Sequence, residues 1–274
     1  MMKSILYFGF FAILSSCAPF VDSPFSDSLL RPERGLNTQN GAMIGDINPG
    51  DSIRLAIFAD PHQNYKALDK VTFGMNQNGP YTFIAGLGDY TNSSYNLEYD
   101  QFIESLSRLE GIRLMTIGNH DTIGAGPELF KKAFGELNSF VDRGAWRFIF
   151  FNSNNLESPE NFSSQWLRDT VDSGPANIMI FTHTPLRDEE RFHGQDAANM
   201  DYVITNSKVK IVFNGHNHVY QLTTDNGTIM LQCGRSEGDH GAHWLITTLD
   251  TTSGQFCIKR MDTLEEDCSL SVKP

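Results

Sequence analysis

The stretch Ile112-Arg113-Leu114-Met115-Thr116-Ile117-Gly118-Asn119-His120-Asp121 joins an apolar run to an amide, an imidazole and a carboxylate at consecutive positions. The run over residues 112–117 predicts a short buried strand that ends at Gly118. Ligands bind beyond the carboxyl ends of strands in open α/β sheets, and Asn, His and Asp are residue types that bind metals and transfer protons. The same residues are also common in ordinary turns, so the neighbouring sequence decides whether this stretch is functional.

Two apolar runs nearer the N-terminus have the same form. Residues 53–59 are almost continuously apolar, as in a strand buried on both faces, and residues 81–87 follow the same pattern. Amphipathic helices predicted over residues 65–76 and 96–109 separate the three strands. Right-handed crossovers set successive parallel strands side by side, so their carboxyl ends meet at one edge. We therefore expect the side chains that follow these strands to converge there, namely Asp60, His62, Asp89, Asn119 and His120.

The second half of the chain alternates strands and helices before it becomes an antiparallel meander. Strands are expected over residues 146–151, 177–181 and 209–213, helices over 164–171 and 195–206, and meander strands over 228–232, 244–249 and 255–261. Five of the eight histidines lie at or just beyond predicted strand ends: His62, His120, His183, His216 and His218. Carboxylate and imidazole groups together form a ligand set that suits Mn, Fe, Zn or Co rather than Ca.

Five short blocks, in this order along the chain, resemble those of the calcineurin-like metallophosphoesterases: Asp60-x-His62, Gly88-Asp89, Gly118-Asn119-His120-Asp121, His183 and Gly215-His216-x-His218. Each block alone is a weak motif, but here each follows an apolar strand. The resemblance extends over residues 53–250. It implies an α/β (α+β) fold, in which two mixed β-sheets form a four-layer sandwich with flanking helices.

The resemblance also implies a role for each site residue. One metal ion would be held by Asp60, His62 and His218, and the other by Asn119, His183 and His216, with Asp89 bridging the two. His120 would face the substrate without binding metal. Asp121 would orient His120, which is a common task of a carboxylate beside an imidazole.

The implied cofactors are two divalent or mixed-valence transition metal ions, with Mn, Fe, Zn and Co as candidates. Two such ions about 3.5–4 Å apart clamp a phosphoryl group and lower the pKa of a bridging water, whose hydroxide attacks phosphorus. His120 would then protonate the leaving oxygen. The purple acid phosphatase subfamily is disfavoured, because it adds a tyrosine three residues after the bridging aspartate and Asn92 occupies that position here.

The expected partner is a small phosphate-ester substrate, of phosphodiester or nucleotide type, and a phosphomonoester on the same dinuclear site is the alternative. A cap from residues 122–145 or 184–208 would shape the pocket. A different class of function is a non-catalytic envelope lipoprotein that retains the fold for binding. Nucleic acid is not an expected partner, because the chain has a net charge of −12 and no basic run. The sequence leaves the oligomeric state open.

The N-terminus has the form of a targeting signal. A basic start and an apolar block over residues 5–14 predict a signal peptide over residues 1–16, too short to span a bilayer. The ending Leu14-Ser15-Ser16-Cys17 resembles a bacterial lipoprotein box, which implies lipid attachment at Cys17. This interpretation predicts a lipid-anchored protein of the cell envelope, at the outer membrane or facing the periplasm. The alternative is an ordinary secretory signal and a secreted protein.

The segment after the signal is rich in Pro and Gly, so it predicts a tether over residues 17–52 ahead of a domain over 53–274. In an exported protein, Cys257 and Cys268 form a candidate disulfide and Cys233 would be free, although three thiols do not fix a connectivity. His193, His240, His243 and Arg235 lie outside the five blocks, and ordinary structural or surface roles are at least as good an interpretation for them.

Overall fold

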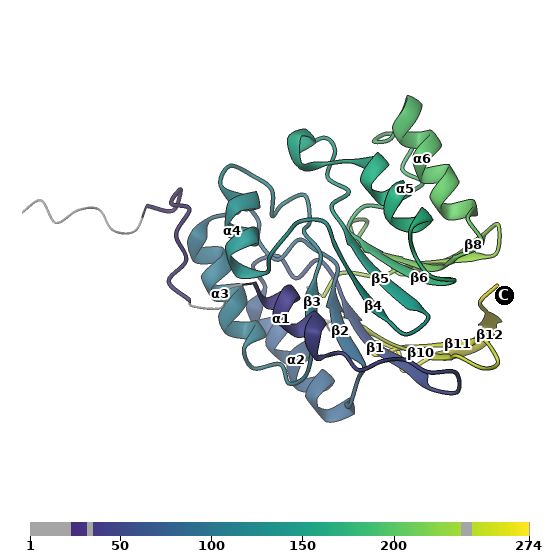
Figure 1. Cartoon of the computed structure of the whole chain (residues 1–274). Helices are drawn as coiled ribbons and strands as arrows, with labels where there is room; N and C mark the ends of the chain where they lie inside the picture. The colour runs from purple at the N-terminus through teal and green to yellow at the C-terminus, as the bar shows by residue number, and fades with distance from the viewer. Residues whose placement is uncertain (1–22, 32–34, 237–242, 274) are drawn as a thin grey trace, which may run out of the picture.

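Two six-stranded sheets face each other across the centre of the protein in a computed structural model, which describes residues 23–31, 35–236 and 243–273 (Figure 1). The first sheet has the strand order β12-β11-β10-β1-β2-β3. Its strands are β1 (Ser52–Phe58), β2 (Phe83–Gly86), β3 (Arg113–Met115), β10 (Leu245–Asp250), β11 (Gln255–Arg260) and β12 (Glu266–Ser271). β1, β2 and β3 are parallel, whereas β10, β11 and β12 join by antiparallel pairing.

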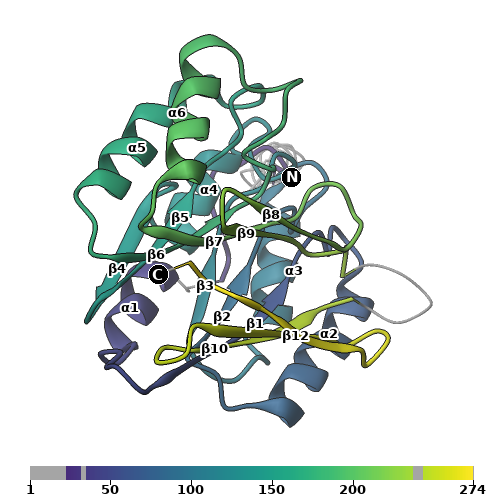
Figure 2. The ribbon, with the colours of Figure 1, turned by 90° about the vertical axis from the view of Figure 1, so that its right-hand side faces the viewer.

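The second sheet is also mixed and has the order β4-β5-β6-β7-β9-β8 (Figure 2). It contains β4 (Ser139–Arg143), β5 (Trp146–Phe151), β6 (Asn177–Thr182), β7 (Val209–Asn214), β8 (Gln221–Asp225) and β9 (Thr228–Gln232). β5, β6, β7 and β9 run parallel, and the two outer strands are antiparallel to their neighbours. Consecutive strands β5, β6 and β7 are therefore connected through helices, as their nearly continuous apolar sequences predict.

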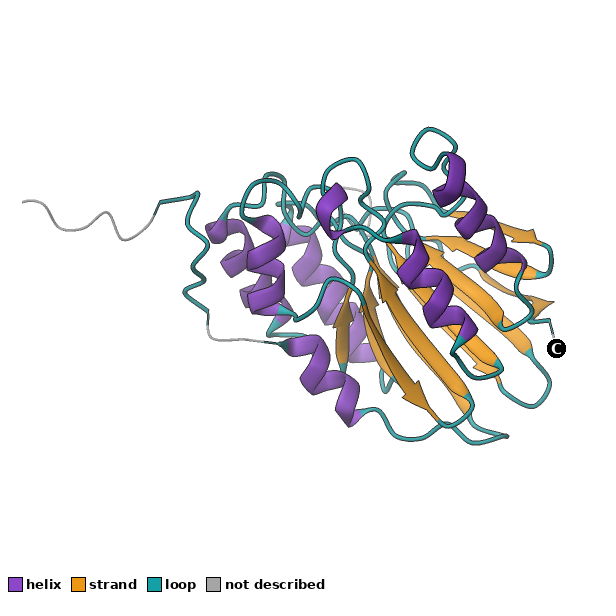
Figure 3. Cartoon of the chain, turned by 45° about the horizontal axis from the view of Figure 1, so that its top comes forward, coloured by secondary structure: helices purple, strands orange, loops and turns teal. Residues whose placement is uncertain are grey.

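Helices cover the outer face of each sheet, which makes four layers (Figure 3). The first sheet packs against α2 (Tyr65–Asn78), α3 (Asn96–Leu106) and α4 (Gly126–Ala133), and the second against α5 (Ser164–Asp172) and α6 (Gly194–Thr205). A short 3₁₀ helix, η1 (Pro159–Asn161), precedes α5. Between the sheets, Phe181 stacks on both Phe150 and Phe213 with ring centroids 4.9 Å apart. The predicted sandwich of two mixed sheets flanked by helices is confirmed.

The stretch predicted as a tether contains a helix, α1 (Leu36–Met43), that is packed onto the domain. The Asn37 side chain donates to the Met115 carbonyl oxygen at 2.7 Å and accepts from the Met115 N–H at 2.8 Å. On the other side, the Arg143 guanidinium donates to the carbonyl oxygens of Gly41 and Ile44. α1 therefore satisfies polar groups on β3 and β4, the edge strands of the two sheets, so the folded part of the chain extends upstream of residue 53.

The structure also places the predicted cap segments and the predicted disulfide. The stretches considered as caps form α4, β4 and α6, which are parts of the layers rather than a separate cap. Cys257 and Cys268 form a disulfide between β11 and β12, and Cys233 is free and buried. The predicted signal peptide and Cys17 lie outside the described residues. Within the described part of the chain, no helix has the length and apolar character needed to cross a bilayer.

Candidate metal centre

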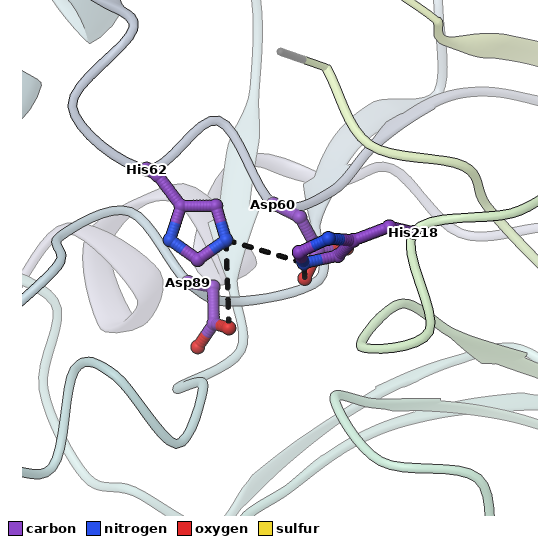
Figure 4. Close-up of side chains that lie close together, drawn as sticks. All are labelled: Asp60, His62, Asp89 and His218. Carbon is purple, nitrogen blue, oxygen red and sulfur yellow. Dashed lines mark hydrogen bonds and ion pairs between the residues drawn. The ribbon is translucent and has the colours of Figure 1, made fainter.

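Four of the predicted ligands form one cluster, because each offers a ligand atom within 4.8 Å of the others: Asp60, His62, Asp89 and His218. In Figure 4 the imidazoles of His62 and His218 point toward each other, with 3.2 Å between their Nε2 atoms and the two carboxylates close by. Asp60 Oδ1 lies 3.6 Å from His218 Nε2, and Asp89 Oδ2 lies 4.0 Å from His62 Nε2. These side chains come from the loops after β1, β2 and β7.

A second cluster shares Asp89 with the first and adds His183 and His216. His183 Nε2 lies 3.2 Å from Asp89 Oδ2 and 3.2 Å from His216 Nδ1. The Asn119 side-chain oxygen lies between the two imidazoles, 2.9 Å from His183 Nε2 and 3.1 Å from His216 Nδ1. The fold thus brings together all seven predicted ligands, and Asp89, the predicted bridging carboxylate, belongs to both clusters.

The backbone around the clusters is held in an unfavourable conformation. Five of the predicted ligands have positive φ: Asp60 (51°), His62 (45°), Asp89 (56°), His216 (75°) and His218 (61°). For residues with a Cβ this left-handed conformation costs roughly 1–2 kcal/mol each, and such strain gathers at functional sites. The close packing of these loops also requires glycine at position 118, because a Cβ there would collide with the backbone nitrogen of Asp89. Glycine at position 118 is therefore a packing requirement of the loop after β3.

The residues present fit transition metal ions. Ligand atoms that surround an ion at about 2.0–2.3 Å lie roughly 3–3.6 Å from one another. Most of the separations given above, from 2.9 to 3.6 Å, fall in or beside that interval. His183 Nδ1 lies 2.7 Å from the Leu87 carbonyl oxygen, and because a carbonyl only accepts, Nδ1 carries the proton. This bond turns the lone pair of Nε2 toward the cluster, as in known metal-binding histidines.

Without a metal ion, the buried carboxylates and imidazoles of the clusters shift one another's pKa values. Burial raises the pKa of Asp60 to about 7, and the charge of Asp89 adds to this shift. Burial alone would also raise the pKa of Asp89, but the charge of His183 outweighs it and lowers that pKa. Burial disfavours the charged form of His183, yet Asp89 raises its pKa to about 9. Without a metal ion the raised pKa of His183 therefore favours its imidazolium form, and a bound cation would take the place of the Nε2 proton and its positive charge.

His120 lies beside the first cluster, with its ring edge-on to that of His62 at a centroid distance of 5.0 Å. Its backbone N–H donates to Asp89 Oδ1 at 2.9 Å, and its Nδ1 lies 2.8 Å from the Asn92 carbonyl oxygen. The resemblance implies that Asp121 orients this ring, but its carboxylate accepts from Thr91 and Gly118 instead. The orienting group is therefore a main-chain carbonyl, which no side-chain motif reveals, and Asp121 holds the loops together.

The sequence reasoning missed Glu98, which organises the loop that carries Asn92. Glu98 is 4% exposed, and its carboxylate accepts from the backbone N–H groups of Ser93 and Tyr95 at 3.0 and 2.9 Å and also from the Gln63 side chain. Glu98 is the third residue of α3, with Tyr95 in the N-cap position of a capping box. The acidic residue in the first turn is the available signal, but a Tyr cap conceals it from a search for Ser, Thr, Asp or Asn.

Arg191 is a second residue that the sequence did not single out. It forms a bidentate pair with Glu157, with both N···O distances 2.8 Å, and it is 9% exposed. Burial is the main cause that lowers the pKa of His216 to about 4, and the charges of His183 and Arg191 lower it further. The positive charge of Arg191 therefore acts on the second cluster, where it favours the neutral form of His216.

The remaining described candidates belong to neither cluster, although the positive charge of Arg235 helps to lower the pKa of His218. His193 is exposed before α6, whereas His243 is buried and its Nδ1 lies 3.1 Å from Asp262 Oδ2. Arg235 is exposed, and His240 lies outside the described residues. Tyr90 is fully buried, with its ring stacked on Phe102 and its hydroxyl accepting from the Gly88 N–H. This tyrosine therefore faces the core.

Comparison with known sequences identifies a family. The model of the calcineurin-like phosphoesterase family matches residues 53–220, which contain all seven predicted ligands and His120. No curated protein matches the chain significantly.

Solved structures share the fold at low sequence identity. A purple acid phosphatase from yellow lupin (Lupinus luteus) seeds is 14% identical with a TM-score of 0.61, and the match covers 83% of this chain and 54% of that one, so this chain spans about half its length. A dimetal phosphatase from Danio rerio is 12% identical with a TM-score of 0.61, covering 80% and 98%. A putative 5′-nucleotidase from Staphylococcus aureus is 12% identical with a TM-score of 0.52, covering 81% and 54%.

Proposed function

Because this chain belongs to the calcineurin-like phosphoesterase family, we propose that it hydrolyses a phosphate ester at a dinuclear metal centre. The observation that carries this proposal is the position of Asp89, whose carboxylate is a member of both ligand clusters. One ion would be held by Asp60, His62 and His218, and the other by Asn119, His183 and His216. Bound there, two cations would draw charge from the phosphoryl oxygens and supply an activated water.

The protein groups divide the remaining work. The Nδ1 atom of His120 donates to the Asn92 carbonyl oxygen, so its Nε2 is the atom left to act on the substrate. In the imidazolium form, Nε2 donates a proton to the leaving oxygen as the bond from phosphorus to that oxygen breaks. Asp121 keeps the loops after β2 and β3 in register through Thr91 and Gly118.

We propose a phosphodiester or nucleotide-type substrate, with a phosphomonoester as the alternative on the same site. The fold shared with a putative 5′-nucleotidase is compatible with a nucleotide but does not choose between the esters. We further propose that the chain is a lipoprotein of the cell envelope, anchored through lipid on Cys17, since the apolar block ends at that cysteine.

A substrate panel tests the activity. Manganese-loaded protein is incubated with a nitrophenyl phosphomonoester, a bis-nitrophenyl phosphodiester, nucleoside monophosphates and cyclic nucleotides. His120→Ala is compared with His193→Ala, an exposed histidine outside the clusters. We expect hydrolysis of at least one ester, lost in His120→Ala and kept in His193→Ala. Failure of the metal-loaded wild type on every ester favours the non-catalytic envelope lipoprotein.

A further inference from the structure

A hollow of about 430 Å³ without charged residues lies beside the loops that carry His120. Eight residues line it: Pro24, Phe25, Ser93, Ser94, Tyr95, Ile123, Gly124 and Ala125. The absence of charge from this lining contrasts with the chain as a whole, whose net charge is −12. The hollow is close to the centre, because the Ser94 hydroxyl donates to the His120 carbonyl oxygen at 2.7 Å.

Three large apolar side chains of this lining face solvent, and we call them the rim surface: Phe25, Tyr95 and Ile123. They are 75%, 37% and 46% exposed, respectively. The edge of one aromatic ring meets the face of the other, with the centroids of Phe25 and Tyr95 5.4 Å apart. Exposed apolar side chains gathered at one place mark an interaction surface more often than scattered ones do.

The distance along the chain from Cys17 to the rim surface indicates that a membrane covers this surface. Only five residues lie between Cys17 and Ser23, and the six steps from one to the other span at most about 20 Å. Lipid on Cys17 would therefore hold the rim surface within reach of the bilayer. The charges nearby are paired, with Lys132 2.7 Å from Asp27 and Arg31 beside Glu104 at 2.5 Å, so attraction to anionic headgroups is not the driving force.

We propose that the rim surface inserts into the interfacial region of the membrane and turns the His120 side of the centre toward the headgroups. The proposal rests on the lipid anchor of the proposed function, and it adds a fixed orientation to that anchor. An aromatic ring with a polar tip, such as Tyr95, suits the boundary between headgroups and acyl chains. The surface has the apolar character to enter a zwitterionic bilayer without a basic patch.

Quenching by brominated lipids tests this orientation. The full chain is reconstituted into phosphatidylcholine and phosphatidylethanolamine vesicles whose acyl chains carry bromine. Phe25→Trp and Ile123→Trp are compared with Phe73→Trp, since Phe73 is 67% exposed on α2. The fluorescence of the three native tryptophans is subtracted using the unsubstituted chain. Because interfacial side chains lie about 5–10 Å deep, we expect roughly twofold or greater quenching at positions 25 and 123 relative to position 73.

The outcomes separate this proposal from the catalytic one. Equal quenching at all three positions, or none at 25 and 123, overturns the orientation, and so does concentration-dependent self-association that protects the same two tryptophans. The readout needs no substrate, so a His120→Ala background should give the same quenching.

Discussion

The Nδ1 atom of His120 lies 2.8 Å from the main-chain oxygen of Asn92, and this contact fixes which ring nitrogen faces outward. Because a carbonyl oxygen only accepts, the proton on Nδ1 is fixed and Nε2 is the reactive atom. The side chain at position 92 has no part in the contact. The ring is therefore oriented by the path of the loop after β2, and the loop itself is held by Asp121 and Glu98.

Replacing His120 by Ala should lower kcat by about 10²–10⁴ without loss of metal, because proton transfer by a positioned side chain contributes about that much. The backbone N–H of His120, which donates to Asp89 Oδ1, remains in the variant. Steady-state kinetics and elemental analysis on the same preparation check both halves of the prediction. A wild-type kcat in His120→Ala would show that His120 is not the proton donor.

The proposed dinuclear centre predicts that purified protein contains about two transition metal ions per chain. Asp89→Ala should lose both ions and all activity, because Asp89 contributes to both clusters. Chelation should also lower the melting temperature, since a ligand at 100 times its Kd stabilises the folded state by about 2.7 kcal/mol. Fewer than one ion per chain, with full activity, would contradict the dinuclear centre.

Glu98→Ala should lower kcat by about 10- to 100-fold, the range found when a residue that holds the site residues in position is removed. The variant loses the acceptor of the Ser93 and Tyr95 N–H groups, so the carbonyl that holds His120 is no longer fixed. KM should change less than kcat, because the expected loss is in the orientation of the acid. Glu104→Ala, on the same helix but exposed, is the matched control. Equal kcat in the two variants would assign Glu98 a purely structural role.

Asn37→Ala should destabilise the fold by about 1–3 kcal/mol, because it leaves buried backbone groups of Met115 without partners. Thr38→Ala, on the exposed side of α1, should change the free energy of unfolding little. Urea unfolding of both variants gives the comparison. If the two variants were equally stable, α1 would not secure the sheet edge.

His243 should contribute to the pH dependence of stability. Burial lowers its pKa below the ordinary 6.5, against the opposing effect of Asp262. As pH falls, the unfolded chain therefore binds this proton first, so the contribution of neutral His243 is present above about pH 6.5 and is lost below it. Between about pH 7 and 5, His243→Gln should lose less stability than wild type, whereas His193→Gln should follow wild type. A steeper loss in His243→Gln would reverse this sign.

The strands that carry the centre could be predicted because they are buried on both faces. Apolar runs followed by Asp, His or Asn marked the ends of β1, β2, β3, β6 and β7, and all seven predicted ligands lie together. The edge elements gave weaker patterns. β12 is mostly exposed, and α1 buries Asn37 and Asn40 where an amphipathic helix would bury apolar residues. The position of α1 depends on polar partners far along the chain, at Arg113 and Met115, which sequence periodicity does not contain.

The same limit explains what was missed at the site. A ligand contributes its own side chain, so its residue type and position are visible in the sequence. Asn92 contributes a carbonyl oxygen that every residue has, and Asp121 acts on backbone N–H groups of two loops. Those relationships are properties of the folded backbone alone.

The pairing of β1 has a consequence for how the protein is made. β1 lies between β2 and β10, so the first strand to leave the ribosome completes its ladder only with residues 245–250. Such long-range pairing slows folding and leaves an open strand edge in the meantime. A nascent or truncated chain therefore lacks a closed first sheet beneath Asp60. Assembly of the centre becomes a late, whole-chain event, in which the last strands to be synthesised decide whether the first ligand is in place.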